Sequence, residues 1–384
     1  MEVLFDHQIF TLQKYGGISR YFCELMNQFS FMPDIRFNLG IRHSYNENIL
    51  IRNNLDKYWS AKCDILCNSQ LFSVLQRNFG VDLLRLMRIN QSESIRLLKK
   101  TEYDLFHPTY YNPYFLKYIV KKPYVLTVHD MIHERYPESF PERDPVKKWK
   151  KKLIEDADSI ISVSENTKKD ILNFYDIDES KINIVYHGNP LERTTTSQFS
   201  DSRLIDRKSC CEYLLFVGNR SGYKNFQFFI NSIAGYLNNK HMHLLCAGGG
   251  SFTSDELHMF QKLNLIKRIH FVDINDSNLS ELYKNARAFI FPSLYEGFGL
   301  PVLEAFSCRC PVILSNSSSL PEVGGNAACY IDPNHSDSIV QGVESVLSDD
   351  NYKKELINRG LQRLKLFSWE KTAYNTKNVY NNLL

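Results

Sequence analysis

The stretch 291–304, Phe-Pro-Ser-Leu-Tyr-Glu-Gly-Phe-Gly-Leu-Pro-Val-Leu-Glu, decides how the rest of the chain is interpreted. It predicts an apolar strand that Pro292 ends, a loop with two glycines, and a helix whose first position is Pro301, where a missing N–H costs nothing. Glycines before a helix N-terminus bring free N–H groups close to an anion. Beside that anion, the carboxylates of Glu296 in the loop and Glu304 in the first helical turn accept hydrogen bonds from hydroxyl groups. The combination indicates a sugar nucleotide.

Each of these features also has a purely structural explanation. A glutamate in a first turn stabilises the helix dipole, and Gly-x-Gly occurs in many ordinary turns. Only the ensemble of strand, glycine loop, helix start and two carboxylates points to a ligand.

Length and composition predict two domains of an α/β protein. The chain has 384 residues, more than one ordinary core holds, and its 43% hydrophobic and 23% charged residues are typical of soluble globular proteins. A net charge of only +3 excludes a global nucleic-acid footprint. We expect an N-terminal domain over 1–190, a polar linker from Leu191 to Ser209 opening a second domain over 191–366, and a C-terminal helix over 367–384.

Cysteine usage and hydropathy bear on location. Nine cysteines without zinc-like spacing favour reduced thiols in a cytoplasmic protein. The N-terminus lacks the basic and apolar regions of a signal peptide, and no apolar run approaches the ~20 residues of a membrane span. Peripheral contact with an anionic membrane is the expectation for the five lysines from Lys147 to Lys152 around Trp149. A solvated helix face explains the same lysines equally well.

Glycines and polar residues follow the predicted strands of the first half. His129 and Asp130 come after the strand 124–128 and place an imidazole and a carboxylate at a strand's C-terminal end, where open α/β sheets bind ligands. Gly16 and Gly17 precede a helix and offer N–H groups to an anion, although a Gly-Gly pair is also a common tight turn. His133 stands four residues after His129, but no third ligand accompanies them. We therefore predict no metal site.

The second half carries cations after its first strand. Gly218 ends the strand 213–217, and Arg220 and Lys224 follow it, two cations suited to neutralising a diphosphate. A glycine triplet begins at Gly248, without the Gly-x-Gly-x-x-Gly form of a dinucleotide site.

These residues together resemble the family-four retaining glycosyltransferases. Glu296 and Glu304 form the Glu-x7-Glu pattern of that family, and the remaining motifs match it in order. They are Val128-His129-Asp130, Val217-Gly218-Asn219-Arg220 with Lys224-Asn225, the stretch from Ser315 to Pro321-Glu322-Val323, and Phe367-Ser368-Trp369. The N-terminal Phe5-Asp6-His7-Gln8 and Gly16-Gly17-Ile18-Ser19-Arg20-Tyr21 are similar to the mannosyltransferase-like branch that builds bacterial surface polysaccharides.

The resemblance implies the GT-B fold, in which two Rossmann-like domains with parallel sheets face a central cleft. It implies that the first domain binds the acceptor, that the second binds the sugar nucleotide, and that the C-terminal helix 367–384 packs back on the first. No metal or other cofactor is expected, because Arg220 and Lys224 take over the neutralisation of the diphosphate. The family often places Arg or another polar residue directly before the lysine, whereas this chain has Tyr223 there, with Arg220 further upstream.

The resemblance also implies roles for individual residues. Arg220 and Lys224 hold the diphosphate, Glu304 holds the ribose, and Glu296 with His129 serves the transferred sugar and the reacting centre. Base contacts come from Phe271 and Val272. The remaining donor-binding residues are Gly16, Gly17, Gly218, Gly297, Phe298, Gly299 and Leu300.

The predicted reaction is the transfer of mannose from GDP-mannose to a lipid-linked saccharide in lipopolysaccharide or O-antigen assembly, with retention of configuration. The developing negative charge on the departing diphosphate is what the two cations stabilise. Two alternatives remain open at this point. One is the same fold with a UDP-sugar donor, UDP-glucose or UDP-N-acetylglucosamine, and the other is a non-catalytic sugar-nucleotide-binding protein.

Overall fold

In the computed structural model of the chain, residues 1–50, 83–119, 121–191, 212–220, 222–274 and 276–384 are described. The chain divides into two compact units. Unit 1 comprises Met1–Arg135, Phe140–Gly188 and Trp369–Leu384, and unit 2 comprises Tyr136–Ser139 and Asn189–Ser368. Nearly all of the predicted linker 191–209 lies outside the described residues.

Unit 1 is built on parallel strands. β1 (Glu2–Asp6) lies between β2 (Arg36–Gly40) and β3 (Leu105–His107), and β5 (Ser159–Ser162) lies between β4 (Val125–Val128) and β6 (Ile182–Ile184). A parallel bridge from Phe106 to Tyr124 links β3 to β4. Because all these strands run in one direction, the residues that follow β1, β4 and β6 lie at the same edge.

The helices of unit 1 bury one apolar stripe each. In α2, Tyr21, Phe22, Leu25, Met26 and Phe29 recur at helical spacing and are all buried. The α-helices are α1 (Gln8–Leu12), α2 (Gly17–Phe29), α3 (Glu47–Leu50), α5 (Leu83–Lys100), α6 (Ile132–Arg135), α7 (Val146–Asp156), α8 (Glu165–Phe174) and α16 (Trp369–Asn381). The apolar run Ile49-Leu50-Ile51 within 49–52 predicts a strand. This is wrong for 49–50, because they end α3, and 51–52 lie outside the described residues.

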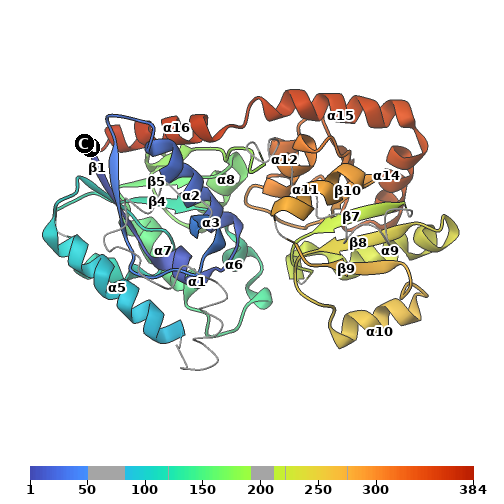
Figure 1. The fold of residues 1–384 in the computed structure, drawn as a ribbon, viewed down its shortest axis with the longest axis horizontal. Coiled ribbons are helices and arrows are strands. Elements are labelled where there is room, and N and C mark those ends of the chain that lie inside the picture. Colours follow the sequence, from blue (N-terminus) through green and yellow to red (C-terminus); the bar gives the residue numbers. More distant parts are fainter. Residues whose placement is uncertain (51–82, 120, 192–211, 221, 275) are drawn as a thin grey trace. The chain divides into compact units, whose positions relative to one another are not determined.

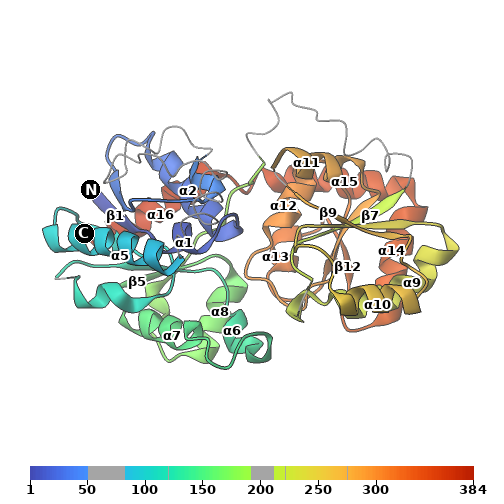
Figure 2. The same ribbon diagram turned by 60° about the horizontal axis from the view of Figure 1, so that its bottom comes forward.

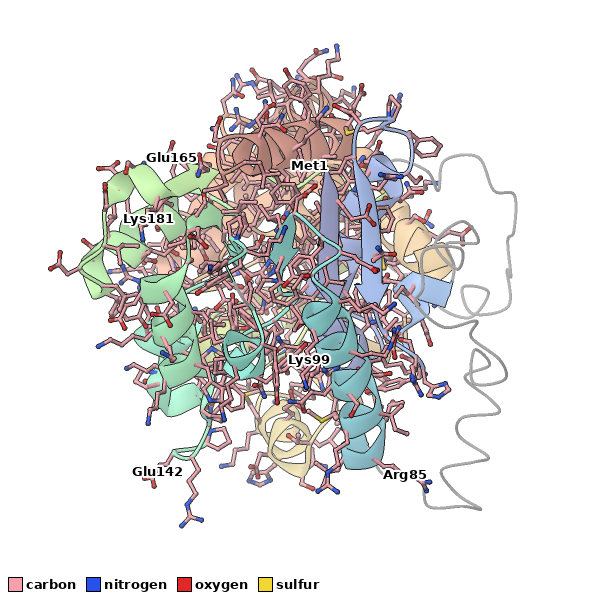
Figure 3. All side chains as sticks on the ribbon, turned by 90° about the vertical axis from the view of Figure 1, so that its left-hand side faces the viewer. Met1, Arg85, Lys99, Glu142, Glu165 and Lys181 are labelled. Atoms are coloured by element: carbon pink, nitrogen blue, oxygen red, sulfur yellow. The ribbon has the colours of Figure 1, made fainter. Side chains whose placement is uncertain are left out.

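The C-terminal helix belongs to the core of unit 1. Figures 1 and 2 show α16 running beside α2, although the whole of unit 2 separates them in the sequence. Trp369 and Tyr380 are buried in the same hydrophobic cluster as Phe5 and Phe22. On the outer side, Figure 3 shows Arg85 and Lys99 near opposite ends of α5, whose exposed face is basic.

Unit 2 has a six-stranded parallel sheet with the order β12-β11-β10-β7-β8-β9. Alternate residues of its strands point to opposite faces. Leu214 and Phe216 of β7 pack with α9 and α14 on one face, whereas Phe289 of β10 meets Tyr283 of α11 on the other. The strands are β7 (Tyr213–Val217), β8 (His243–Ala247), β9 (Ile269–Val272), β10 (Ala288–Phe291), β11 (Val312–Ser315) and β12 (Cys329–Ile331).

Helices cover both faces of this sheet (Figure 2). They are α9 (Phe226–Asn239), α10 (Ser254–Lys262), α11 (Asp276–Asn285), α12 (Leu300–Ser307), α13 (Leu320–Gly324), α14 (Ser336–Ser348) and α15 (Asp350–Leu364). The predicted α/β architecture with two parallel-sheet units is confirmed. In the described residues, no helix is both long and apolar enough to cross a membrane.

Candidate active site

The loop after β10 forms the turn that the sequence predicted. Gly299 has φ of +98° and precedes α12, and a Cβ at this position would lie 2.9 Å from Cδ2 of Leu320. Only glycine fits there without strain. The helix begins at Leu300, one residue earlier than predicted, so Pro301 is its second residue. Glu304 therefore lies just beyond the first turn and not within it.

Three serines after β11 hold this loop. The backbone N–H of Glu296 donates to Oγ of Ser318 at 2.9 Å, and Oγ of Ser319 donates to the carbonyls of Glu296 and Phe298 at 2.9 and 3.1 Å. Ser317 donates to the carbonyl of Leu294. The matched stretch 315–323 includes these serines, but no role was predicted for them. The available signal was the run Ser317-Ser318-Ser319 just after a buried strand.

Lys224 and Glu296 form an ion pair. The Nζ of Lys224 lies 2.6 Å from Oε1 of Glu296, and the two side chains are only 14% and 10% exposed. The ammonium also lies 5.0 Å from the ring centre of Phe291. The cation predicted for the diphosphate and the carboxylate predicted for the sugar are therefore in direct contact at the strand ends of β7 and β10.

Glu304 is buried and its carboxylate has a tyrosine partner. The hydroxyl of Tyr283 donates to Oε2 of Glu304 at 3.0 Å. Burial, and next the charge of Glu304, raise the pKa of Tyr283 well above its usual value, so this hydroxyl keeps its proton. Tyr283 thus fixes one carboxylate oxygen of Glu304 in a defined orientation.

Arg220 is bound by groups of its own unit. Gly218, with φ of +115°, directly follows β7, and Arg220, two residues later, is 8% exposed. Its guanidinium binds the carboxylate of Glu256 and backbone carbonyls of the loop after β8. Phe271 and Val272 end β9 at the same edge of the sheet, both half-buried, and the ring of Phe271 contacts that of Phe252.

One hollow of unit 2 is lined by Arg220 but by none of the other residues predicted to bind the donor. A pocket of about 680 Å³ lies between the first turns of α9 and α10. Arg220 and Gly249 contribute to its wall, but Lys224, Glu296 and Glu304 do not. We therefore locate the candidate site by the charged residues at the strand ends and not by this pocket.

In unit 1, His129 sits in an aromatic cluster at the end of β4. Its ring stacks on that of His187, with centroids 6.1 Å apart and an angle of 24°, and meets the edge of Tyr21 at 5.3 Å. Its backbone N–H donates to the hydroxyl of Tyr111 at 3.0 Å. Burial, and then the charges of His107 and Lys150, lower the pKa of His129 to about 3, so the imidazole is neutral at physiological pH.

The partners of His129 come from distant parts of the sequence. His187 follows β6 as His129 follows β4, and Trp369 of α16 packs against the rings of His187 and Tyr21. The pair His187-Gly188, shortly after the strand 182–184, was the signal for the second imidazole. The contribution of Trp369 had no local signal, because it depends on the return of the chain to unit 1.

The tandem glycines lie at the start of α2, where Gly16 precedes the helix as predicted. Gly17 is its first residue, and Gly16 is extended, with a hypothetical Cβ 2.4 Å from Oε1 of Gln13. That side-chain oxygen accepts the N–H of Ser19, so part of the helix start is already satisfied within the protein. Arg20 is buried and its guanidinium contacts the hydroxyl of Tyr15.

The lysine segment is less uniform than its sequence indicates. Lys150 is fully buried, with its Nζ 2.8 Å from Oε2 of Glu134 and 3.0 Å from the carbonyl of Asp130. It is therefore excluded from any membrane-facing surface, because the periodicity of α7 turns it into the core. Lys151 and Lys152 pair with acidic residues one turn on, and Lys147 and Lys148 are exposed.

Cysteines and metal ligands give no sign of a metal centre in the part of the chain that the structure describes. There, no three His, Cys, Asp or Glu side chains are grouped to hold an ion. The described cysteines are buried and form no disulfide with one another: Cys23, Cys246, Cys308, Cys310 and Cys329.

Comparisons with known proteins bear on the family and the fold. A family model described as "Glycosyl transferases group 1" matches residues 205–363, and one described as "Glycosyltransferase Family 4" matches 70–193. The chain is 29% identical over 392 residues to O-antigen chain mannosyltransferase B of Escherichia coli, covering 95% of each chain. It is 27% identical over 222 residues to O-antigen chain mannosyltransferase RfbU of Salmonella typhimurium, covering 58% of this chain and 60% of that one.

The fold is also that of solved glycosyltransferase structures. Sucrose-phosphate synthase from Thermosynechococcus elongatus superposes with a TM-score of 0.73 at 19% identity, covering 100% of this chain and 98% of the other. At this identity the likeness speaks for the fold alone, and it confirms the predicted GT-B architecture with two Rossmann-like domains.

Proposed function

Since the chain belongs to the family-four glycosyltransferases and to their O-antigen mannosyltransferase branch, we propose that it transfers mannose from GDP-mannose to a lipid-linked saccharide. The observation that carries the donor site is the buried pair of Lys224 and Glu296 at neighbouring strand ends. The choice of mannose and of a polysaccharide acceptor is supported by the mannosyltransferase named among the relatives, which matches 95% of this chain.

Lys224 and Glu296 form a switchable pair in this proposal. A buried ammonium and carboxylate stabilise each other only while both are present. When the donor binds, the diphosphate becomes the partner of Lys224, and Glu296 turns to hydroxyl groups of the sugar. Glu304, already held by Tyr283, accepts hydrogen bonds from the ribose.

The reaction breaks the bond between the anomeric carbon and the diphosphate oxygen. The acceptor hydroxyl oxygen bonds to the anomeric carbon on the same face, and its proton passes to the departing phosphate. Lys224 and the N-terminus of α12 stabilise the negative charge that develops on that phosphate, which is the largest electrostatic contribution available to such a site. No protein carboxylate acts as a nucleophile, and no metal or other cofactor takes part.

His129 takes part as a neutral hydrogen-bonding group. With a pKa lowered to about 3, its imidazole has one donor and one acceptor nitrogen over the whole physiological range. It therefore positions hydroxyl groups of the sugar near the reacting centre without adding charge. Gly16 and Gly17 at the start of α2 serve the phosphate from unit 1 in this proposal, and Phe271 and Val272 serve the base.

The decisive test is a donor screen with the purified protein. Calorimetric titration with GDP and UDP separates the two donor classes, and turnover of GDP-mannose with a lipid-linked acceptor identifies the sugar. We expect submillimolar binding of GDP, weaker binding of UDP, and an α-linked product from the α-linked donor. Preferential binding of UDP, with turnover of UDP-glucose or UDP-N-acetylglucosamine, would replace the mannose assignment. An inverted product would contradict the mechanism.

We also propose peripheral contact with an anionic membrane through the exposed part of α7. Lys147 and Lys148 are exposed beside the half-buried Trp149, which is the composition of an interfacial segment. Such contact would bring the enzyme to a lipid-linked acceptor at the inner face of the cytoplasmic membrane.

A further inference from the structure

Arg220 has all of its guanidinium nitrogens engaged within unit 2. Nε lies 2.7 Å from Oε1 of Glu256, and Nη1 donates to the carbonyl of Gly248 at 3.0 Å. Nη2 donates to the carbonyls of Gly250 and Ser251 at 2.9 and 3.1 Å. The side chain is 4% exposed, and its Cζ lies 4.9 Å from the ring centre of Phe252.

This arrangement competes with direct binding of a diphosphate by Arg220. Moving the guanidinium to a ligand would break its hydrogen bonds to three backbone carbonyls and its ion pair with Glu256. All of these contacts would have to be replaced at once, which costs free energy. Lys224, by contrast, has one ionic partner among the described residues, Glu296.

The loop that Arg220 binds contains three consecutive glycines and depends on outside contacts to keep one conformation. Gly248, Gly249 and Gly250 have φ of +80°, +73° and +76°, and glycine loses the most conformational freedom on ordering. The loop is tightly enclosed at Gly249, where a Cβ would lie 2.7 Å from the carbonyl oxygen of Gly218 and 3.0 Å from Nη1 of Arg220. Arg220 therefore fixes three residues that have little conformational preference of their own.

The hydrogen bonds from Arg220 also determine where the N–H groups of the loop point. In a planar trans peptide, the N–H lies opposite the C=O of the preceding residue. Because Gly248 and Gly250 direct their carbonyls to Arg220, the N–H groups of Gly249 and Ser251 face away from it, and both residues are exposed. The loop presents these donors at the end of β8, the strand next to β7.

Glu256 connects the same loop to α10. Its Oε2 accepts the N–H of Thr253 at 2.7 Å, and Oγ1 of Thr253 accepts the N–H of Glu256, which is a complete capping box. Arg220 thus joins the end of β7, the glycine loop and the start of α10 through a single guanidinium.

We propose that Arg220 is a positioning residue that builds the 248–251 loop of the nucleotide site and does not itself contact the diphosphate. The inference rests on the proposed function for its ligand, a nucleoside diphosphate. Of the two cations predicted from the sequence, only Lys224 then contacts the diphosphate directly.

The test compares affinities for GDP and GMP by calorimetry, with UDP and UMP used instead if the donor screen favours uridine. The variants are Arg220→Met, Glu256→Gln, their double mutant and Lys224→Met. Arg268→Met is the matched control, because Arg268 is a half-buried arginine bound to Asn238 at the opposite end of the strands. We expect Arg220→Met to weaken diphosphate and monophosphate binding by the same factor, about tenfold.

The other variants sharpen the comparison. Lys224→Met should weaken the diphosphate more than the monophosphate, and the double mutant should bind no worse than Arg220→Met, because Glu256 and Arg220 act through one loop. A selective loss of diphosphate affinity in Arg220→Met, or additive losses in the double mutant, would overturn the inference. If Arg220→Met does not fold, Glu256→Gln supplies the same comparison.

Hydrogen exchange of the free protein decides the question without a ligand. The amides of residues 249–253 should exchange faster in Arg220→Met than in the wild type and the Arg268→Met control. Unchanged exchange there would refute the positioning role. Should the wild type bind no nucleotide, the proposed function fails, whereas the exchange result still decides whether Arg220 organises the loop.

Discussion

The two units arrange their candidate functional residues in opposite ways. Unit 1 places His129 among neutral rings, those of His187, Tyr21 and Trp369, and burial holds its imidazole uncharged. Unit 2 places charged groups in loops and neutralises them in pairs, Lys224 with Glu296 and Arg220 with Glu256. Unit 1 therefore depends on packing and protonation, whereas unit 2 depends on electrostatic partners, and a bound anion can replace the partner of Lys224.

The largest expected difference between the units is their response to acid. All four fully buried histidines of the described residues, His7, His107, His129 and His187, lie in unit 1. Burial lowers the pKa of His7 to about 4 and of His107 and His129 to about 3, and that of His187 well below 6.5. Below pH 6.5 the unfolded chain therefore binds more protons than the native one. The contribution of these histidines to the free energy of unfolding is fully present above that pH and is lost as the pH falls.

Acid should therefore destabilise unit 1 before unit 2. Each such histidine removes up to about 1.4 kcal/mol of stability per pH unit between the unfolded and folded pKa values. Hydrogen exchange measured from pH 7 to 4.5, corrected for intrinsic rates, should show unit 1 opening first. The three tryptophans at 59, 149 and 369 fall within the residue range of unit 1 and give a fluorescence check. Opening of both units at the same pH would contradict the prediction that the buried histidines make unit 1 more sensitive to acid.

The next largest effect concerns the packing that supports His129. Trp369→Ala should destabilise unit 1 by about 3–5 kcal/mol, because it removes a 2% exposed indole from the core. Denaturant unfolding followed by unit-resolved hydrogen exchange measures it. Tyr374→Ala, on the same helix but 58% exposed, should change stability by less than about 0.5 kcal/mol. Equal losses in the two variants would mean that α16 is not held through Trp369.

Removing a charge from unit 2 should act on catalysis. Lys224→Ala should lower kcat by roughly 10²–10³-fold, because the departing diphosphate loses its cation. Lys240→Ala is the control, since Lys240 is an exposed residue at the end of α9. Initial rates with saturating donor give the comparison. Retention of full activity in Lys224→Ala would show that the Lys224–Glu296 pair is not part of the donor site.

The smallest expected effect separates lysines that look alike in the sequence. Replacing Lys147 and Lys148 with Gln should weaken binding to vesicles containing anionic phospholipid by about 2 kcal/mol in total. Replacing Lys151 and Lys152 should do less, because Glu155 and Asp156 already neutralise them. Cosedimentation with vesicles measures both. Identical behaviour of the two double variants would argue against an α7 contact.

Local chemistry explains which parts could be predicted. The turn at Gly299, the strand before it and the cations after β7 are encoded within a few residues, so the sequence predicted their positions to within one or two residues. The contact of Lys224 with Glu296 was not predicted, since it requires β7 and β10 to be neighbours in the sheet. The burial of Lys150 and the enclosure of Arg220 were missed for the same reason, because their partners Glu134 and Glu256 come from other elements.

The return of α16 to unit 1 has a consequence for biosynthesis. Residues 369–384 are translated after all of unit 2, whose main segment, Asn189–Ser368, is 180 residues long (368 − 189 + 1). At about 5–20 residues per second, the N-terminal part of unit 1 waits roughly 10–40 s on the ribosome before Trp369 and Tyr380 emerge. Unit 2 can complete its sheet during that interval. Although its sequence starts first, unit 1 is the last to fold.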